Sequence, residues 1–180
     1  MINIIFESHA TTFDNEQKIG TGWNDSKLSD LGKLQAKELG ERYKNKRFDL
    51  VFCSDLTRSI DTAKIAFNDK YEIIIDPRLR ECNFGTYNGR PMSMIDSMKE
   101  DMISMPYPAG ESFNDALARM KSFLSDLLEN HDGTNILIIG HRATQYGLDN
   151  RVNKEPLSMA VLRPWKWQPG WNYSLQRTDD

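Results

Sequence analysis

The chain has 180 residues, a formal net charge of -3, and 39% hydrophobic and 27% charged residues, which is typical of a single globular domain with a substantial core. The slight negative charge gives no reason to expect a nucleic acid or an anionic membrane as a partner. No apolar run approaches the roughly 20 residues of a bilayer span, and no basic segment precedes the first apolar run, so we expect neither a membrane span nor a secretory signal. Cys53 and Cys82 are too few for a disulfide framework or a zinc site, which favours a reduced, cytoplasmic setting.

Strands and helices alternate along the first half of the chain. Ile2 to Phe6 is a short apolar run typical of a buried strand, and small or polar residues follow it. Ser29 is a good N-cap for a helix that ends near Tyr43. The pattern predicts a loop over 13–26, a helix over 29–43 with Leu31, Leu34, Leu39 and Tyr43 on its apolar face, strands over 48–53 and 71–75, and a helix between these strands that begins at Ser54 and Asp55.

The second half continues the alternation. A strongly amphipathic helix is predicted from Ser112 to about 130, and the continuous apolar run 135–139 indicates a strand covered on both faces. We expect a short helix and a loop over 91–108, a helix from 143, a strand over 159–162 and an edge strand over 172–176. The tail also holds Trp165, Trp167 and Trp171, which we expect to pack across the last sheet edge, although stacking on a base or sugar is the alternative.

Histidines and arginines stand where the predicted strands end. His9 follows the first strand, Arg58 lies in the first turn of the next helix, and His141 and Arg142 follow the strand at 135–139. The carboxyl ends of parallel strands meet at one edge of a sheet, so these side chains are expected to converge. Taken singly, His9 is as easily a structural residue, and Arg58 is as easily paired with water or a surface carboxylate.

Two imidazoles, guanidinium groups and helix N-termini together suit a phosphoryl group. A neutral imidazole can attack phosphorus and form a phosphohistidine, while arginines and a second histidine stabilise charge on the phosphoryl oxygens. Glu81 is the best-placed candidate for the acid that protonates the leaving oxygen. No H-E-x-x-H or similar spacing is present, so we expect no metal and no cofactor.

Several segments, in the same order, resemble the motifs of the histidine phosphatase superfamily, which has the phosphoglycerate mutase-like fold. His9 in S-H-A-T-T resembles the phosphorylated histidine of R-H-G-E-T, and His141 in G-H-R resembles the family's second histidine. The segment C-S-D-L-T-R, which ends at Arg58, resembles the phosphate-binding S-S-D-L-x-R, and R-E-C-N-F-G around Glu81 resembles the acid/base segment R-E-x-x-F-G. Asn15 matches a phosphate-contacting asparagine, and T-G-W at 21–23 resembles a substrate loop.

The resemblance implies a three-layer α/β/α fold with a mostly parallel central sheet, in one domain over 1–180 with a small cap around 86–110. It implies hydrolysis of a small phosphorylated metabolite through a phosphohistidine, without metal or cofactor. The candidate catalytic residues are His9, Arg58, Glu81 and His141, and the candidate substrate-binding residues are Ser8, Asn15, Thr21, Gly22 and Arg142.

Two positions beside His9 depart from the family pattern. Ser8 stands in place of an arginine that binds the phosphate, and Ala10 stands in place of a glycine. We hypothesise that Arg142, which replaces the usual glycine after the second histidine, restores a guanidinium. A non-catalytic relative that binds phosphate or another anion remains an alternative. A phosphoglycerate mutase-type phosphotransferase is a further alternative, although the short segment between Glu81 and His141 favours a hydrolase, because a mutase needs an elaborate cap.

Overall fold

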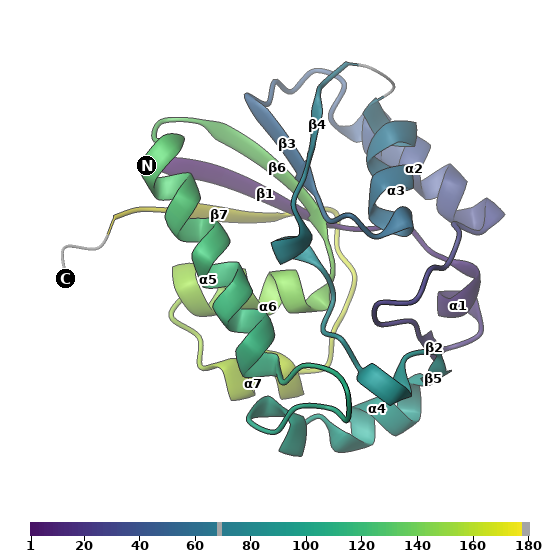
Figure 1. The fold of residues 1–180 in the computed structure, drawn as a ribbon. Coiled ribbons are helices and arrows are strands. Elements are labelled where there is room, and N and C mark those ends of the chain that lie inside the picture. The colour runs from purple at the N-terminus through teal and green to yellow at the C-terminus, as the bar shows by residue number, and fades with distance from the viewer. Residues whose placement is uncertain (68–69, 178–180) are drawn as a thin grey trace.

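The computed structural model describes residues 1–67 and 70–177 and is built around a five-stranded sheet in the order β4-β3-β6-β1-β7 (Figure 1). The pairs of β1 with β6, β6 with β3 and β3 with β4 are parallel, whereas β7 pairs antiparallel with β1 at the edge. The mostly parallel sheet expected from the sequence is therefore confirmed. The strands are β1 (Ile2–Ser8), β3 (Leu50–Cys53), β4 (Ile73–Ile75), β6 (Asn135–Gly140) and β7 (Trp171–Leu175).

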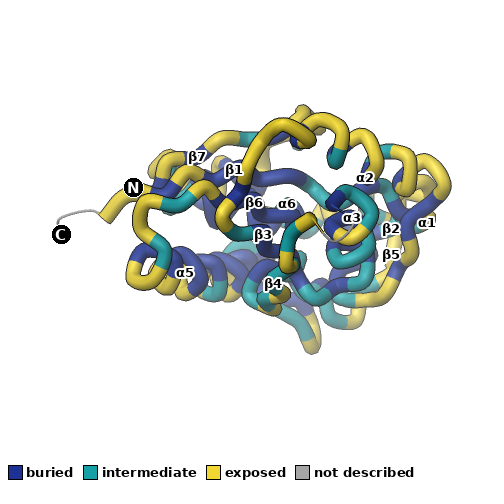
Figure 2. The backbone as a smooth tube through the Cα atoms, turned by 90° about the horizontal axis from the view of Figure 1, so that it is seen from above, coloured by how far each residue is buried: buried dark blue, intermediate teal, exposed yellow. Residues whose placement is uncertain are grey.

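Helices cover both faces of this sheet, which gives the three-layer arrangement. Helices α2 (Asp30–Arg42) and α3 (Thr57–Phe67) lie on one side, and α5 (Phe113–Asn130) and α6 (Arg142–Val152) lie on the other (Figure 1). Successive side chains of a strand point to opposite faces, so Ile4 and Phe6 pack into the core under α5, and Ile5 packs into the core under α2. This explains why the central strands are continuous apolar runs, and Figure 2 shows them buried between exposed loops.

Short elements make up the remainder of the described chain. The region 13–26, predicted as a loop, contains helix α1 (Phe13–Glu16) and strand β2 (Ile19–Gly20), which pairs with β5 (Arg90–Pro91) in a small second sheet. Local patterns do not predict so short a sheet, because its two strands are far apart in the sequence. Helix α4 (Met92–Met98) follows β5, and single 3-10 turns occupy Pro77–Leu79, Gly85–Tyr87 and Asp101–Ile103.

Helix α2 begins after Ser29 as predicted, and Leu39 and Tyr43 of its predicted apolar face are buried, but the other two leucines are not. Leu31 and Leu34 are 51% and 54% exposed. The buried residues include Gly32 and Ala36, because the helix lies against the backbone near Thr11. A Cβ added to Gly32 would lie 1.9 Å from the carbonyl oxygen of Thr11. The glycine permits this close approach, which decided the orientation of the helix over the pattern of leucines.

The predicted strand at 159–162 is wrong. These residues belong to helix α7 (Leu157–Leu162), which begins directly after Pro156. Leu157, Ala160 and Val161 are buried at the i, i+3, i+4 spacing of one helix face. The short apolar run was ambiguous between strand and helix, and packing against α6 decided it. In the described part of the chain, no helix is both long and apolar enough to cross a membrane.

Candidate active site

His9 and His141 meet because β1 and β6 pair in register. Ser8 lies opposite Gly140 at the carboxyl ends of the two strands, and the backbone N–H of His9 donates to the Gly140 carbonyl over 3.0 Å. The next residue on each strand is a histidine, and the centroids of the two imidazole rings are 5.0 Å apart. The predicted convergence of these strand ends is confirmed.

The environment of His9 makes it a neutral imidazole with one defined free nitrogen. Its Nδ1 lies 2.8 Å from the carbonyl oxygen of Ala10. A carbonyl can only accept, so Nδ1 carries the proton and Nε2 keeps its lone pair. Burial, and next the positive charge of Arg58, lower the pKa of His9 from 6.5 to about 3. His9 is therefore uncharged at neutral pH, as a nucleophile must be.

His141 is held from one side and is unsatisfied on the other. Its ring is 1% exposed, and its Nε2 lies 2.7 Å from Ser54 Oγ. Its Nδ1 is buried without a partner among the described residues. Burial, and then Arg58, hold the pKa of His141 well below its usual value. An unpaired buried polar atom is costly, and an oxygen of a bound anion beside His9 is a partner that would satisfy it.

The sequence led us to expect that Ser54 caps the helix that follows it, but it does not. Helix α3 begins at Thr57, so Ser54 lies in the turn between β3 and α3 and directs its hydroxyl at His141. Asp55, the other predicted cap residue, instead pairs with Arg80. Sequence reasoning missed these contacts, because a Ser-Asp pair after a strand has the same pattern whether it caps the next helix or bonds to residues of other segments.

Arg58 brings a buried cation to the same strand ends. It is 2% exposed and donates to the carbonyl oxygens of Gly22 and Asn24 over 2.7 and 3.2 Å. No carboxylate in the described part of the chain forms a salt bridge with it, and burial lowers its pKa. A cation in the first turn of α3 also opposes the helix dipole. A bound anion would supply the negative charge that Arg58 lacks.

Gly22 and Thr62 position Arg58. Gly22 has a left-handed backbone (φ +54°), and a Cβ there would meet Asn88 Oδ1 at 1.8 Å, so its carbonyl can face Arg58 only because it is glycine. Thr62 Oγ1 donates to the Arg58 carbonyl and accepts from the Ala10 N–H. Sequence reasoning missed Thr62, although its place one turn after Arg58 on the same helix was a usable signal.

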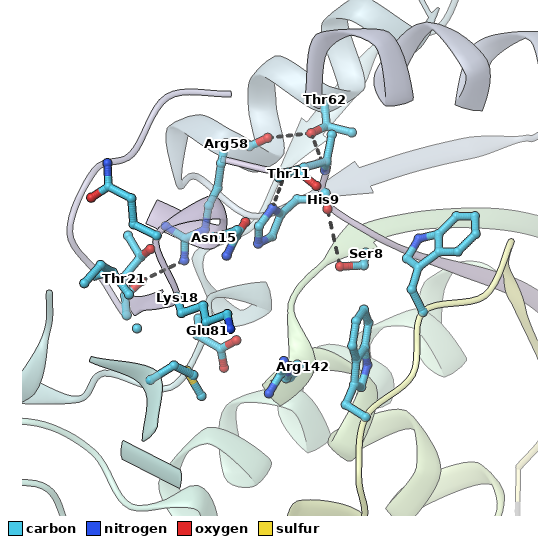
Figure 3. A pocket seen from close by; sticks show the side chains of 18 of the residues that line it. Ser8, His9, Thr11, Asn15, Lys18, Thr21, Arg58, Thr62, Glu81 and Arg142 are labelled. Atoms are coloured by element: carbon cyan, nitrogen blue, oxygen red, sulfur yellow. Dashed lines mark hydrogen bonds between the residues drawn. The ribbon is translucent and has the colours of Figure 1, made fainter. Parts of the chain in front are cut away.

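Glu81 reaches the cavity from the opposite side (Figure 3). Its Oε1 accepts from the backbone N–H groups of Cys82 and Ala143 over 2.8 and 3.2 Å. Ala143 lies in the first turn of α6, directly after Arg142. No described residue donates a hydrogen bond to Glu81 Oε2, so this oxygen is the one left to exchange a proton with a ligand.

The remaining predicted residues line the same cavity, and they differ in which polar groups are free to bind a ligand. Asn15 Oδ1 accepts from the Thr12 N–H over 3.0 Å, which leaves the amide nitrogen of Asn15 to donate. Thr21 Oγ1 is already engaged with Asp14 over 2.9 Å. Ser8 is half-buried, and its hydroxyl lies 3.4 Å from the carbonyl oxygen of His9.

Arg142 projects into the cavity from the first position of α6 (Figure 3). Its guanidinium carbon lies 5.0 Å from the centroid of the Trp165 ring. Trp165 and Trp167 both line the cavity, whereas the ring centroid of Trp171 lies 5.5 Å from that of Phe6. The predicted packing across the last sheet edge therefore holds for Trp171, and the other two indoles face a ligand space.

Most of these groups line one cavity of about 940 Å³, whereas the predicted residue His141 is not in its wall and lies next to His9. Its size is well above that of a phosphate, so it also has room for the rest of a substrate. In residues 1–67 and 70–177, no three His, Cys, Asp or Glu side chains come together in a way that could hold a metal ion. The predicted site residues in its wall are Ser8, His9, Asn15, Thr21, Gly22, Arg58, Glu81 and Arg142, and helix α4 adds Met92, Ser93 and Asp96.

Comparisons with known proteins agree with this geometry. The chain is 32% identical over 150 residues (78% of this chain, 73% of the other) to "Putative phosphoserine phosphatase 2" of Hydrogenobacter thermophilus. It is 29% identical over 150 residues (78% and 70%) to "Probable phosphoglycerate mutase GpmB" of Yersinia pestis. The crystal structure of the alpha-ribazole phosphatase from Shigella flexneri superposes with a TM-score of 0.79 at 26% identity, covering 88% of this chain and 83% of that one. The sequence model of the histidine phosphatase superfamily (branch 1) matches residues 4–163, and the chain therefore belongs to this superfamily.

Proposed function

We propose that the protein hydrolyses a small phosphorylated metabolite through a phosphohistidine formed on His9. The observation that carries this proposal is the meeting of three groups. A neutral His9 and an Arg58 that no described carboxylate pairs with lie in the cavity wall, and a partly unsatisfied His141 lies beside His9. Relatives of the chain are named as phosphatases of phosphoserine and alpha-ribazole phosphate, which supports a small phosphomonoester as the substrate class.

In the first step, Nε2 of His9 attacks the phosphorus atom. A P–N bond forms while the bond between phosphorus and the ester oxygen breaks, and Oε2 of Glu81 gives its proton to the departing oxygen. The hydrogen bond from Nδ1 of His9 to the Ala10 carbonyl keeps the lone pair on the attacking nitrogen. Glu81 is suited to this role because backbone donors hold only its other oxygen.

In the second step, water attacks the phosphohistidine. Glu81, now a carboxylate, accepts the proton of the water while the P–N bond breaks, and His9 returns to its neutral form as phosphate leaves. In both steps Arg58, the amide nitrogen of Asn15 and Nδ1 of His141 donate to the phosphoryl oxygens. None of these donors has to move far, since each already lines the cavity or lies next to it.

Arg142 is proposed to supply the guanidinium that Ser8 lacks. Its cation stands at the N-terminus of α6, where the helix dipole favours an anion. A charge-assisted hydrogen bond contributes about 1.5–3 kcal/mol, or roughly 10- to 150-fold in binding or rate. Enzymes accelerate reactions by at least about a millionfold, so the substitution at Ser8 weakens the site without silencing it.

The segment around 86–110 is proposed to act as a small cap within one domain that spans residues 1–180. Met92, Ser93 and Asp96 of α4 line the cavity, which supports a cap that contacts the leaving group of a substrate. We further propose that the reaction needs no metal ion and takes place in the cytoplasm. The first point rests on the histidine chemistry above, and the second rests on two buried, free cysteines.

Two other functions compete with this one. A non-catalytic anion-binding protein is favoured by Ser8, which removes a phosphate ligand next to the nucleophile. Phosphoryl transfer between two positions of one substrate is favoured by relatives that are named as probable phosphoglycerate mutases. The short segment between Glu81 and His141 argues against the mutase, because the intermediate must stay enclosed until its phosphate is returned.

Incubation with an aryl phosphate, comparing the wild type with His9→Ala, tests the proposal. The wild type is expected to release phosphate and to carry an acid-labile phosphoryl group after rapid quenching, and the variant is expected to do neither. Equal and negligible turnover by both proteins would favour the anion-binding protein. A screen of phosphorylated metabolites then separates the hydrolase from a mutase, because the hydrolase releases phosphate and the mutase forms an isomer.

A further inference from the structure

Arg142 is a charged side chain without a charged partner in the described part of the chain. No carboxylate forms a salt bridge with it, and the positive end of the α6 dipole lies at its own backbone. Its guanidinium carbon lies over the face of Trp165, at 5.0 Å from the ring centroid. A long arginine side chain has many rotamers, so this face restricts where the charge can be.

Trp165 is itself fixed by other residues. Its indole N–H donates to Oε1 of Gln145 over 2.8 Å, and Gln145 is 3% exposed. The ring also lies 6.0 Å from Trp171, which packs on Phe6 of the central sheet. Gln145 is one helical turn after Arg142 on α6, so the same helix carries the arginine and anchors the indole beneath it.

We propose that Trp165 is the positioning residue for Arg142: it holds the guanidinium toward the phosphoryl end of the cavity and so compensates for the arginine absent at Ser8. This inference rests on the proposed function, because it presupposes that Arg142 binds the phosphoryl oxygens. The indole restricts the arginine without neutralising it, whereas a carboxylate in its place would compete with the substrate's own negative charge.

The structure provides a matched control in Trp167. This residue also lines the cavity, and it also lies beneath a guanidinium, that of Arg42 at 5.8 Å. Arg42, however, is already paired with Glu7 over 3.0 Å. Loss of the Trp167 ring, which is 59% exposed, therefore removes a similar stacking contact without releasing Arg142.

The test measures the inhibition constant of orthovanadate, which mimics phosphate, and kcat/KM for 4-nitrophenyl phosphate. Trp165→Ala is expected to weaken orthovanadate about two- to thirtyfold, the range of a cation–π contact. Trp165→Phe, which keeps an aromatic face, is expected to recover most of the loss. Trp167→Ala, which leaves the Trp165 face in place, is expected to leave the inhibition constant of orthovanadate close to that of the wild type. If Trp165→Ala does not fold, which its melting temperature will show, the Phe variant and the double variant below still decide the question.

The discriminating measurement combines these variants with Arg142→Ala. If Trp165 acts through Arg142, replacing Trp165 with Ala or Phe has no further effect once Arg142 is alanine. Losses that simply add would overturn the proposal, because Trp165 would then contact the ligand or support the fold by itself. Weakened binding in Arg142→Ala with wild-type binding in Trp165→Ala overturns it as well, while leaving the proposed function intact. Unchanged binding in Arg142→Ala overturns the phosphate-binding role of Arg142 and this inference together.

Discussion

Ser54 Oγ lies 2.7 Å from Nε2 of His141, and it is the hydrogen-bond partner that the described residues give to this imidazole. The hydroxyl comes from the turn after β3, and the imidazole from the end of β6, which are neighbours in the sheet. If the hydroxyl donates to Nε2, the proton of His141 resides on Nδ1 and can be directed at a phosphoryl oxygen. In that arrangement, a residue in the turn after the neighbouring strand β3 sets the tautomer of His141.

Ser54→Ala is expected to lower kcat by about 5- to 150-fold, because it leaves a second nitrogen of His141 unpaired at a cost of about 1–3 kcal/mol. Steady-state kinetics with an aryl phosphate measures the effect. The matched control is Ser59→Ala, which removes another buried hydroxyl of the same region, bonded to the Ile139 carbonyl rather than to a histidine. Equal losses in both variants would show that only general packing had been disturbed.

Glu81→Gln is expected to affect substrates according to their leaving groups. An alkyl phosphate needs a proton on its departing oxygen, so its hydrolysis should slow by about 10²- to 10⁴-fold, the usual contribution of a general acid. A 4-nitrophenyl ester leaves readily without one and should slow far less. The ratio of the two kcat/KM losses is the measurement, and a ratio near one would remove Glu81 from the role of acid.

Ser8→Arg tests whether Arg142 replaces the absent arginine. In an Arg142→Ala background, the new guanidinium is expected to restore orthovanadate binding by roughly 10-fold or more, as for a charge-assisted hydrogen bond. In the wild-type background the gain should be smaller, because Arg142 already donates to the phosphoryl oxygens there. An equal gain in both backgrounds would mean that Arg142 serves a different purpose.

The two histidines of the site should make the stability of the protein depend on pH. The pKa of His9 is lowered from 6.5 to about 3 in the folded state, so below pH 6.5 the unfolded chain takes up a proton that the folded chain refuses. Stability is therefore unaffected above pH 6.5 and falls between pH 6.5 and 3, with a slope of up to about 1.4 kcal/mol per pH unit from this residue. Urea unfolding at a series of pH values gives the free energy of unfolding of the wild type and of His9→Asn. The difference between these two free energies is expected to change only in this pH window. Parallel curves would contradict the lowered pKa.

Gly32→Ala is expected to destabilise the protein, because its Cβ would meet the Thr11 carbonyl oxygen at 1.9 Å. Overpacking of this kind costs about 1–3 kcal/mol, and it should also displace the chain that carries His9. Leu34→Ala, in the same helix but 54% exposed, should change stability by no more than about 0.5 kcal/mol. Thermal unfolding of both variants checks the contrast. A larger loss of stability in Leu34→Ala than in Gly32→Ala would indicate that the helix buries the predicted leucines instead.

The sequence alone predicted the elements that carry strong periodic or capping signals. The helix after Ser112 and the strand at 135–139 are in the predicted places, because a long amphipathic pattern is typical of a helix and an isoleucine-rich apolar run is typical of a covered strand. The same reasoning failed at 159–162, where a short apolar run suited both a strand and a helix. The polar residues after the strands predicted that His9, Arg58, His141 and Arg142 converge, whereas Asn15, Thr21 and Gly22 were predicted only through the resemblance to the family.

Only the tertiary structure decided how those side chains are held. Ser54 and Trp165 contact His141 and Arg142 from segments that are distant in the sequence, and Thr62 joins Arg58 to the backbone N–H of the distant Ala10. The tautomer of His9 likewise depends on one carbonyl, that of Ala10, whose direction is set by the packing around it. A linear pattern records residue types and spacing, whereas hydrogen-bond partners and ring contacts depend on strand register and helix packing, which fix distances to within an ångström.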